Sequence, residues 1–409
     1  MKIDLVSSAV LVRRTFRYRI YPSDEQAIRL ARWEDAMRFL WNLANEQRLM
    51  GLARPHGERK YYSAFDQINE LRGLRSDLPW LADVPRNACA QMLIVLADSW
   101  RRCFEGSSGR PQWKKKGVDG VVLCEPHSKS WRLEGGSLIF PKLGRIRAIV
   151  HRPLEGRSKT CSIVKDIDQW FALIVCEVQV PVVRRRDSVV ALDVGCVDLI
   201  ADSDGNKISN PHWLRSSSGQ IARAQRSLSR KKLGSRNREK AKVRFARLHR
   251  KVRRRRDHLL HEVSARYAKS HGVVVVERLK IKNMVAEGGW RKAGLNRSIM
   301  DSGWRTLVSM LRYKLILEGG ILVDVPAAYS SQTCVVCGVV DCESRVSRSL
   351  FRCSKCGHSD DADVNAAKVL KSRASHSVLP VEGKLPWSSR RSRKSSTTGI
   401  SLSSQGAAL

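Results

Sequence analysis

The sequence predicts two structural parts: a β-rich part with inserted helices, then an α/β part that carries a cysteine-rich insert. Three observations support this. The first half contains strand-like segments that alternate arginine with aromatic and aliphatic residues. The second half contains short apolar segments that each end in an acidic residue, with a long basic helical tract between them. Two Cys-x2-Cys pairs then interrupt the α/β pattern. The 409 residues are enough for two or three domains.

The first strand and the helix after it are located by periodicity and capping. Residues 13–22 alternate arginine with Phe16, Tyr18 and Ile20, which is the pattern of a half-exposed strand. Ser23 and Gln26 have the spacing of a capping box, so a helix should begin there. We expect much of its apolar face to come from Ile28, Ala31, Ala36, Phe39, Leu40 and Leu43.

The rest of the first half predicts further helices and then a small β-barrel. Helical patterns cover residues 61–104 and are separated at Pro79 and Pro85. Four tryptophans should lie in the helical core: Trp33, Trp41, Trp80 and Trp100. From about 120 to 183 short strands dominate, at 136–140, 145–151 and 170–180. We therefore expect residues 1–22 and 106–183 to form one barrel, with residues 23–105 as a helical insert.

The second half predicts an α/β domain. The expected order is a strand at 188–192 ending at Asp193, a hairpin at 197–209, a basic helical tract at about 219–268, a strand at 273–276 ending at Glu277, a helix at about 299–318, a strand at 321–325, the cysteine cluster and a last helix at about 363–370. The domain should comprise 184–330 and 359–370, with 331–358 as the cysteine-rich insert. The tail at 371–409 is rich in serine, lysine and arginine without periodicity, which predicts disorder.

Three acidic residues are candidates for a catalytic site. Asp193 and Glu277 end apolar strands, and Asp363 opens the last helix. Any one of them alone is most simply a solvated strand end or a helix cap. Their order along the chain is the layout of an RNase H-like domain, in which the ends of parallel strands meet at one crevice. Three carboxylates there repel one another unless cations bind, and two Mg²⁺ ions so held can clamp a phosphodiester.

Four cysteines have the spacing of a zinc ribbon. They form two Cys-x2-Cys pairs that are fifteen residues apart: Cys334, Cys337, Cys353 and Cys356. A glycine directly follows each pair, as a tight turn requires. We expect one structural zinc ion, because four thiolates leave no open position for water. A pair of disulfides is the alternative. Cys342 lies between the pairs and is expected to be a bystander, and His358 is expected to be a surface residue and not a ligand.

Basic residues predict a polyanionic partner. Lysine and arginine number 75 against 39 acidic residues, a net charge of +36 that favours nucleic acid first and an anionic membrane second. Residues 222–256 alone hold seventeen Lys/Arg and one acid, Glu239. We select as nucleic-acid-binding candidates Arg17, Arg19, Lys114, Lys115, Arg230, Lys231, Lys232, Arg253 and Arg254. Phe16 and Tyr18 could stack on bases, but the protein core is their more usual place. The basic segment at 390–394 could add nonspecific attraction.

Composition also limits the class of protein. A hydrophobic content of 42% excludes a wholly disordered chain. No apolar run approaches the ~18 residues that a transmembrane helix needs, and the N-terminus lacks the apolar region of a signal peptide. We therefore expect a chain without a membrane partner, in a reducing cytoplasmic compartment and associated with the nucleoid when bound to DNA.

Several motifs together resemble one family. The most specific are Tyr-Ser-Ser-Gln-Thr-Cys-Val-Val-Cys-Gly at 329–338 and Asp-Val-Asn-Ala-Ala at 363–367. Supporting motifs lie at 16–22, 111–114, 192–195 and 276–279. From about 14 to 370 the chain resembles TnpB, the RNA-guided DNA nuclease of insertion-sequence transposons and presumed ancestor of type V CRISPR effectors.

The resemblance implies a fold, a site and partners. The fold would be a WED β-barrel interrupted by a helical REC insert, then a RuvC-type nuclease domain that contains the zinc ribbon. Asp193, Glu277 and Asp363 would hold two catalytic Mg²⁺ ions, with Asp361 as the alternative third ligand. The partners would be a guide RNA from the transposon end and double-stranded target DNA with a short flanking motif.

Three other functions stay open alongside this one. They are a nuclease-inactive RNA-guided repressor or transposition accessory protein, a transposase that acts on transposon ends without RNA, and a structural zinc-ribbon protein. The presence of all three acids favours an active endonuclease. Both a monomer and a dimer fit the sequence.

Overall fold

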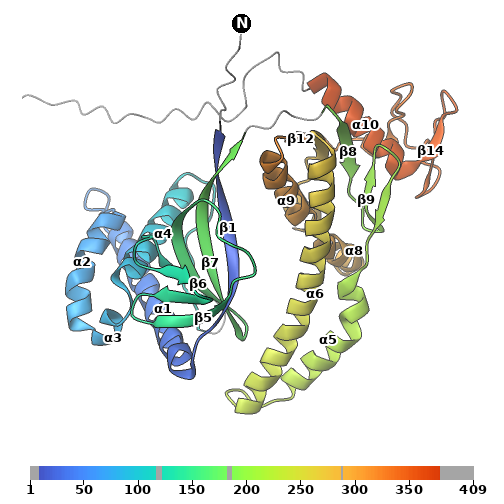
Figure 1. The fold of residues 1–409 in the computed structure, drawn as a ribbon. Coiled ribbons are helices and arrows are strands. Elements are labelled where there is room, and N and C mark those ends of the chain that lie inside the picture. The colour runs from blue at the N-terminus through green and yellow to red at the C-terminus, as the bar shows by residue number, and fades with distance from the viewer. Residues whose placement is uncertain (1–8, 117–121, 182–186, 287–288, 378–409) are drawn as a thin grey trace, which may run out of the picture. The chain divides into compact units, whose positions relative to one another are not determined.

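The computed structural model describes residues 9–116, 122–181, 187–286 and 289–377. Over these residues the chain forms two compact units (Figure 1). The first draws on Met1–Arg184 and Trp213–Arg256, and the second on Arg185–His212 and Asp257–Leu409. The segment Trp213–Arg256 thus groups with the N-terminal part, although it lies inside the 184–330 range that we assigned to one domain. None of the described helices is both long and apolar enough to cross a membrane.

The first unit contains one seven-stranded antiparallel sheet of order β2-β6-β7-β1-β5-β4-β3. Its strands are β1 (Ala9–Tyr21), β2 (Leu123–Glu125), β3 (Arg132–Glu134), β4 (Ser137–Phe140), β5 (Gly144–Ile149), β6 (Arg157–Asp166) and β7 (Gln169–Pro181). The predicted strands are therefore confirmed. Within the described residues no ladder joins the edge strands β2 and β3, so hydrogen bonds do not close the sheet into the predicted barrel.

The alternation along β1 sorts its side chains onto two faces. Phe16, Tyr18 and Ile20 are at most 1% exposed and belong to the core. Arg17 and Arg19 lie on the opposite, outer face, because successive strand residues point to opposite sides. This confirms the core interpretation of Phe16 and Tyr18 and makes both rings unavailable for stacking on bases.

Four helices are inserted between β1 and β2. They are α1 (Asp24–Ala53), α2 (Ala64–Asp77), α3 (Pro79–Ala82) and α4 (Arg86–Phe104). The predicted capping box opens α1: the Ser23 hydroxyl accepts from the Gln26 N–H at 3.2 Å, and the Gln26 side chain accepts from the Ser23 N–H at 3.0 Å.

The predicted apolar face of α1 is wrong in part. Ala36 and Leu40 are buried, but Ile28, Phe39 and Leu43 are exposed. The buried stripe contains Trp33 and Trp41, as predicted, and three residues that the prediction left out, Leu30, Met37 and Ala44. The cause is packing, since one helix face can meet the core and the bulky tryptophans occupy it.

Of the other two tryptophans that we predicted in the helical core, one is buried and one is exposed. Trp100 is 1% exposed, as predicted. Trp80 is 46% exposed, so its predicted core position is wrong. Its ring instead meets Phe39 edge-on at the surface, with centroids 5.1 Å apart.

The inserted helices and the sheet share a single hydrophobic core. Buried residues of α1, α2 and α4 form one continuous cluster with those of the sheet, including Phe16, Leu138 and Ile174. The helical insert therefore has no separate core over the described residues, although we predicted it as a domain of its own.

The basic tract forms two helices, not one. These are α5 (Trp213–Ser229) and α6 (Arg236–Ser270), which diverge from the turn that joins them (Figure 1). Gly234 adopts φ +77° in this turn, and the neighbouring Leu233 is 80% exposed. The Arg238 guanidinium donates to the carbonyls of Leu228 and Lys231, which satisfies two acceptors where α5 ends.

The second unit contains a five-stranded mixed sheet of order β10-β9-β8-β11-β12. Its strands are β8 (Val189–Asp193), β9 (Asp198–Asp202), β10 (Lys207–Ser209), β11 (Val273–Glu277) and β12 (Ile321–Val325). β8, β11 and β12 are parallel, and β9 and β10 are antiparallel to their neighbours. The succession of these strands along the chain is the one predicted for an RNase H-like domain. The four valines of β11 alternate between two buried faces, which explains why this strand has no polar side.

The helices of the second unit include α7 (Ile281–Ala286), α8 (Gly289–Ser302), α9 (Trp304–Leu317) and α10 (Ala362–Ser377). The helix predicted at 299–318 is divided at Gly303, whose φ is +69°. A 3-10 turn (Ser330–Gln332) and the two-stranded ladder of β13 (Leu350–Arg352) with β14 (Ser359–Asp361) flank the cysteines.

The last helix is longer than predicted. α10 runs to Ser377, so residues 371–377 are helical and their predicted disorder is wrong. The reason is packing: Leu370 and Ala374 are buried with Ala191 and Val275 of the sheet. The rest of the predicted tail, including the basic segment at 390–394, lies outside the described residues.

The shared core of the first unit makes a testable prediction. Replacing Leu96, a fully buried residue of α4, with alanine should lower the free energy of unfolding by about 2–5 kcal/mol. Because helices and sheet share one core, hydrogen exchange should accelerate in β1 and β6 as well as in α4. Ile94→Ala is the control, since Ile94 lies on the same helix but is 45% exposed. Acceleration confined to the helices would show that the insert folds as a separate unit.

Candidate functional site

Asp193 and Glu277 are brought to one edge of the sheet by strand pairing. Asp193 is the last residue of β8 and Glu277 the last of β11. These strands are parallel neighbours with Leu192 opposite Val276. Asp193 and Glu277, the next residue of each strand, therefore lie next to each other at the same end of the two strands. Asp363 lies in the first turn of α10, which packs on the same sheet. Segments eighty or more residues apart in sequence are thereby brought to one edge of the sheet.

The electrostatics show that the three carboxylates interact. Burial, and then the negative charges of Glu277 and Asp363, raise the pKa of Asp193 to about 7, while the positive charge of Arg345 opposes them. Burial likewise raises the pKa of Glu277, against a hydrogen bond from Ser330 that lowers it. Such a group of partly buried, mutually repelling carboxylates has the charge and the oxygen ligands to hold a divalent cation.

Two residues that the sequence analysis missed contact these acids. The Ser330 hydroxyl donates to Glu277 Oε1 at 2.6 Å, and Arg345 Nη2 donates to Asp363 Oδ1 at 3.0 Å. Ser330 belongs to the Tyr-Ser-Ser-Gln-Thr-Cys motif, which was available as a signal. Arg345 lies between the two cysteine pairs of the insert, and nothing in its spacing indicated this contact. Among the described residues, only the four cysteines form a group of three or more possible metal ligands whose ligand atoms all lie within 4.8 Å of one another. The oxygens of the three acids are therefore farther apart than the cysteine sulfurs.

Asp361 has a different environment. Its Oδ1 accepts from the backbone N–H groups of Asp363 and Val364, and Lys207 donates to its Oδ2 at 2.7 Å. Burial would raise the pKa of Asp361, but the Lys207 hydrogen bond and the backbone donors hold it below its ordinary value. Asp361 therefore caps α10, and Asp363, not Asp361, is among the groups that act on the pKa of Asp193.

Asn365 joins the acid-bearing helix to the cysteine-rich insert. Its side chain is fully buried; it donates to the Thr333 carbonyl at 2.8 Å and accepts from the Val335 N–H at 3.3 Å. Thr333 and Val335 flank the first cysteine of the cluster. The motif Asp-Val-Asn-Ala-Ala thus combines an acid at the candidate site with an amide that anchors the insert.

The four predicted cysteines form a compact cluster. Cys334 and Cys356 have their sulfurs 3.7 Å apart, and Cys337 and Cys353 3.5 Å apart. These separations exclude disulfide bonds, which need about 2.05 Å. Sulfurs about 2.3 Å from one tetrahedral ion would lie about 3.8 Å from each other. The arrangement therefore fits a four-thiolate metal ion.

Backbone geometry prepares both pairs for such an ion. In each turn the first cysteine accepts at its carbonyl from the following glycine, Gly338 at 3.0 Å and Gly357 at 3.1 Å, and both glycines have φ +72°. Hydrogen bonds, first from the backbone N–H of Cys356 and then from that of Lys355 and from neighbouring thiols, lower the pKa of the Cys353 thiol to about 6, which favours the thiolate. Cys342 is exposed and outside the cluster, as expected.

His358 is also outside the cluster. It is partly buried, not a surface residue as predicted, and its Nε2 has no hydrogen-bond partner among the described residues.

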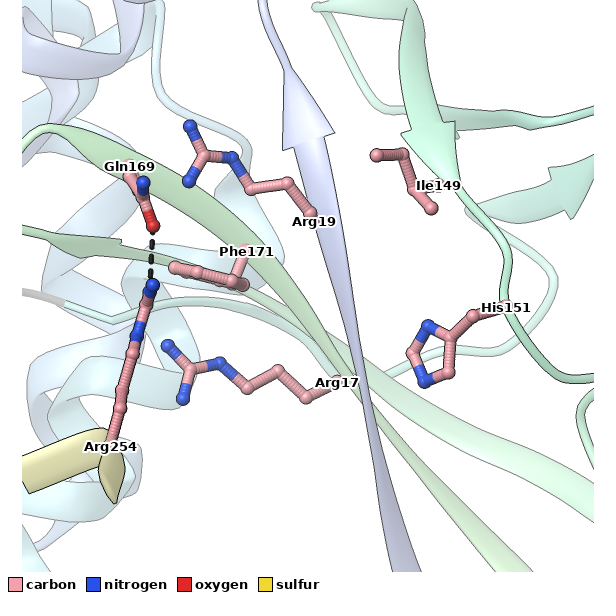
Figure 2. Close-up of a pocket in the computed structure, with 7 residues that line it drawn as sticks. All are labelled: Arg17, Arg19, Ile149, His151, Gln169, Phe171 and Arg254. Atoms are coloured by element: carbon pink, nitrogen blue, oxygen red, sulfur yellow. Dashed lines mark hydrogen bonds between the residues drawn. The ribbon is translucent and has the colours of Figure 1, made fainter. Parts of the chain in front are cut away.

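Four of the predicted nucleic-acid-binding residues lie on strand β1 or in the segment 110–116, and these two pairs have different surroundings. Arg17 and Arg19 project from the outer face of β1 beside Phe171 (Figure 2). Lys114 lies over the Trp41 ring at 4.5 Å, and its segment is tied to α1 through Asn42, which donates to the Lys114 carbonyl. The side chain of Lys115 is exposed. None of these basic groups is buried in the core.

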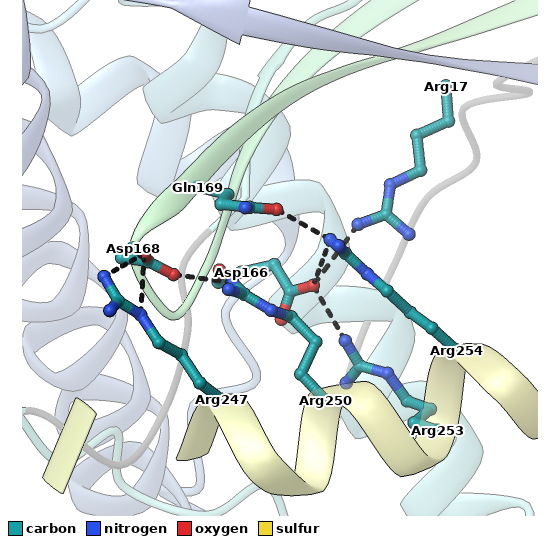
Figure 3. Close-up of polar contacts among 8 residues, drawn as sticks. All are labelled: Arg17, Asp166, Asp168, Gln169, Arg247, Arg250, Arg253 and Arg254. Carbon is teal, nitrogen blue, oxygen red and sulfur yellow. Dashed lines mark hydrogen bonds and ion pairs between the residues drawn. The ribbon is translucent and has the colours of Figure 1, made fainter. Parts of the chain in front are cut away.

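On α6, arginines pair with the tip of the β6–β7 hairpin (Figure 3). Arg247 and Arg250 donate to Asp168 at 2.7 and 2.6 Å, Arg253 donates to Asp166 at 2.8 Å, and Arg254 donates to Gln169 at 2.7 Å. Arg253 and Arg254 are thus engaged within the protein, which the sequence analysis did not foresee. Arg230, Lys231 and Lys232, in the turn after α5, are exposed and make no ion pair within the described part of the chain.

A mixed sheet of this order, with acids at two parallel strand ends and on the last helix, defines an RNase H-like domain with a four-cysteine insert. Models of protein families match three parts of the chain. Residues 173–287 match a family described as "Probable transposase", residues 304–370 match "Cas12f1-like, TNB domain", and residues 12–49 match "Helix-turn-helix domain". In the structure the last of these ranges contains strand β1 and most of α1, not two helices.

Two curated relatives cover most of the chain. RNA-guided DNA endonuclease InsQ of Escherichia coli K12 is 31% identical over 383 residues, 90% of this chain and 93% of that protein. A protein of the same description from Streptomyces pristinaespiralis is 31% identical over 363 residues, 87% of this chain and 88% of that protein. The chain therefore belongs to the TnpB family. Among solved structures, a Cas12f1-sgRNA-target DNA complex matches with a TM-score of 0.49 and 15% identity over 88% of this chain and 99% of that one.

The hairpin–helix ion pairs predict a measurable loss of stability. Asp168→Asn removes the partner of Arg250, whose side chain is 8% exposed, and should lower the free energy of unfolding by about 1–3 kcal/mol. Asp98→Asn, which removes an exposed partner of Arg101, should change it by less than about 0.5 kcal/mol. Chemical denaturation of both variants measures the difference, and equal effects would contradict a stabilising role for the hairpin contacts.

Proposed function

We propose that this chain is a transposon-encoded, RNA-guided DNA endonuclease with a hydrolytic site formed by Asp193, Glu277 and Asp363. The observation that carries the site is the pKa of Asp193, raised to about 7 by burial and by the charges of the other two acids. A divalent cation bound between such carboxylates would relieve their mutual repulsion. The names of the relatives in E. coli and Streptomyces support the activity.

The donor set fits magnesium. All three residues offer carboxylate oxygens, which hard cations prefer to sulfur or imidazole ligands. Two Mg²⁺ ions bound there would activate water and stabilise the leaving 3′ oxygen of a phosphodiester. The protein's own residues hold the carboxylates for this role: Ser330 orients Glu277, and Arg345 neutralises Asp363 until cations and substrate bind.

The remaining parts support binding of nucleic acid. We assign the seven-stranded sheet and its inserted helices to the WED and REC parts, and the cysteine-rich insert to the target-nucleic-acid-binding part. The chain would hold a guide RNA from the transposon end, pair it with double-stranded target DNA, and itself read a short flanking motif. It would act in the prokaryotic cytoplasm, at the nucleoid. Exposed cations such as Arg230, Lys231 and Lys232 would contact phosphates, so binding should weaken steeply with salt.

Substitution of the acids tests the proposed site. Asp193→Ala, Glu277→Ala and Asp363→Ala should each lower the rate of metal-dependent cleavage of guide-matched DNA by about a thousandfold or more, because each removes an oxygen ligand. RNA binding should be unchanged. Cleavage gels and gel shifts with the same matched DNA measure the two properties.

Asp361→Asn is the matched control, because asparagine can still cap α10. This variant should continue to cut. Full cleavage by Asp193→Ala would falsify the site. Binding of matched DNA without any cleavage by the unaltered chain would indicate the alternative function, an RNA-guided repressor. DNA binding that survives ribonuclease treatment would indicate a transposase that needs no RNA.

The cysteine cluster predicts one zinc ion per chain with a structural role. Cys334→Ser or Cys353→Ser should abolish stoichiometric zinc, measured by elemental analysis of the purified protein, and should lower the melting temperature. Cys342→Ser should keep both unchanged, since Cys342 is exposed and outside the cluster. Loss of zinc in the Cys342 variant, or its retention without Cys334, would contradict the assigned ligands.

A further inference from the structure

An arginine-rich pocket opens on the outer face of the first unit's sheet (Figure 2). Its volume is about 430 Å³. Strand register explains its position, since Arg19 of β1 stands between Phe171 of β7 and Ile149 of β5. The lining residues are Arg17, Arg19, Ile149, His151, Gln169, Phe171 and Arg254. Cations from a strand and from helix α6 thus face one concave space.

The ring of Phe171 holds these cations in place. The Arg17 guanidinium lies 3.8 Å from the ring centroid, that of Arg19 5.4 Å and that of Arg254 6.0 Å. Figure 2 shows the three side chains gathered around the ring. Phe171 itself is 8% exposed, and Arg17 lies over its face. The ring therefore positions arginines and does not offer a free surface on which a base could stack.

The positive charge around this pocket exceeds the negative charge. Asp166 is the carboxylate that the pocket arginines share: it lies 3.4 Å from Arg17, 3.8 Å from Arg254, and 2.8 Å from Arg253 beside them (Figure 3). Three guanidinium groups thus share one carboxylate, and no acid lines the pocket. Burial, and then the positive charge of Arg250, lowers the pKa of Arg254, as expected where cations lack counterions.

The unpartnered donor of Arg19 is the clearest sign that this pocket binds an acceptor. Within the described part of the chain it makes no hydrogen bond or ion pair, and its Nε is buried without a partner. A buried N–H group without an acceptor costs about 1–3 kcal/mol, so an acceptor supplied by a ligand would stabilise this arrangement. A phosphate oxygen has the charge and geometry that a guanidinium prefers.

We infer that this pocket binds one nucleotide of the guide RNA, with its backbone phosphate held by Arg17, Arg19 and Arg254. The pocket volume is in the range that accepts a small molecule, so more than a bare phosphate fits. Ile149 gives an apolar wall, and His151 and Gln169 supply polar groups that can reach a ribose hydroxyl, the group that distinguishes RNA from DNA. The inference rests on the proposed function, because it requires RNA as the bound partner.

The test compares two arginines on the same face of β1. Arg19→Gln removes a pocket cation, whereas Arg13→Gln removes one that is 76% exposed and paired with Glu177 outside the pocket. The probes are a labelled single-stranded RNA of mixed sequence and a DNA of the same sequence, titrated with the full chain at several salt concentrations. Arg19→Gln should weaken RNA binding about tenfold and make the log–log salt dependence shallower by about 0.7. Arg13→Gln should leave both quantities unchanged. Neither substitution should change the melting temperature.

The possible outcomes distinguish failure of the proposed function from failure of the pocket inference. If the unaltered chain does not bind the RNA probe, the proposed function and this inference both fail. If it binds and the Arg19 and Arg13 variants behave alike, the pocket inference alone is overturned. Weaker DNA binding with unchanged RNA binding overturns the assignment to RNA. Should Arg19→Gln not fold, Arg254→Gln removes a pocket cation from a different element and must give the same shallower salt dependence.

Discussion

Burial of like charges at one edge of a parallel strand pair is the constraint around which the second unit is organised. Asp193 and Glu277 stand side by side because β8 and β11 are parallel neighbours in register. Burial disfavours their ionised forms and each raises the energy of the other. A ligand of opposite charge compensates such an arrangement, and divalent cations are the ligand that we propose for it. Around this edge lie the groups that limit the repulsion, the Ser330 hydroxyl and the Arg345 guanidinium.

The cysteine-rich insert is connected to this edge by specific contacts. Ser330 lies just before the first cysteine pair and Arg345 between the two pairs, and each contacts one of the acids. Asn365 fastens the first pair to the helix that carries Asp363. A metal ion that orders the insert would therefore also order the surroundings of the carboxylates. This explains physically why a four-thiolate site with no catalytic position lies beside a candidate hydrolytic site.

The basic residues of the first unit serve two purposes. Asp166 and Asp168 at the β6–β7 tip neutralise part of the charge of α6 and connect the helix to the sheet. The cations left over are exposed in the turn after α5 or face the pocket around Phe171. The same residue type thus stabilises the unit where a carboxylate is present and is available to a polyanion where none is. Counting charges along the sequence cannot separate these roles, because the carboxylates that decide them lie about 80 residues away.

The sequence by itself determined the elements and ligands whose signals are local. The alternation in β1, the capping box at Ser23, the two Cys-x2-Cys turns and the order of strands in the second unit all follow from neighbouring residues. Tertiary structure alone decided the features that depend on distant partners. Packing chose which face of α1 is buried, exposed Trp80, extended α10 to Ser377 and merged the inserted helices with the sheet in one core. It also placed Arg345 on Asp363 and gave Asp361 a capping role. Burial and pairing are properties of a position in space, and residues far apart in the chain define that position only after it folds.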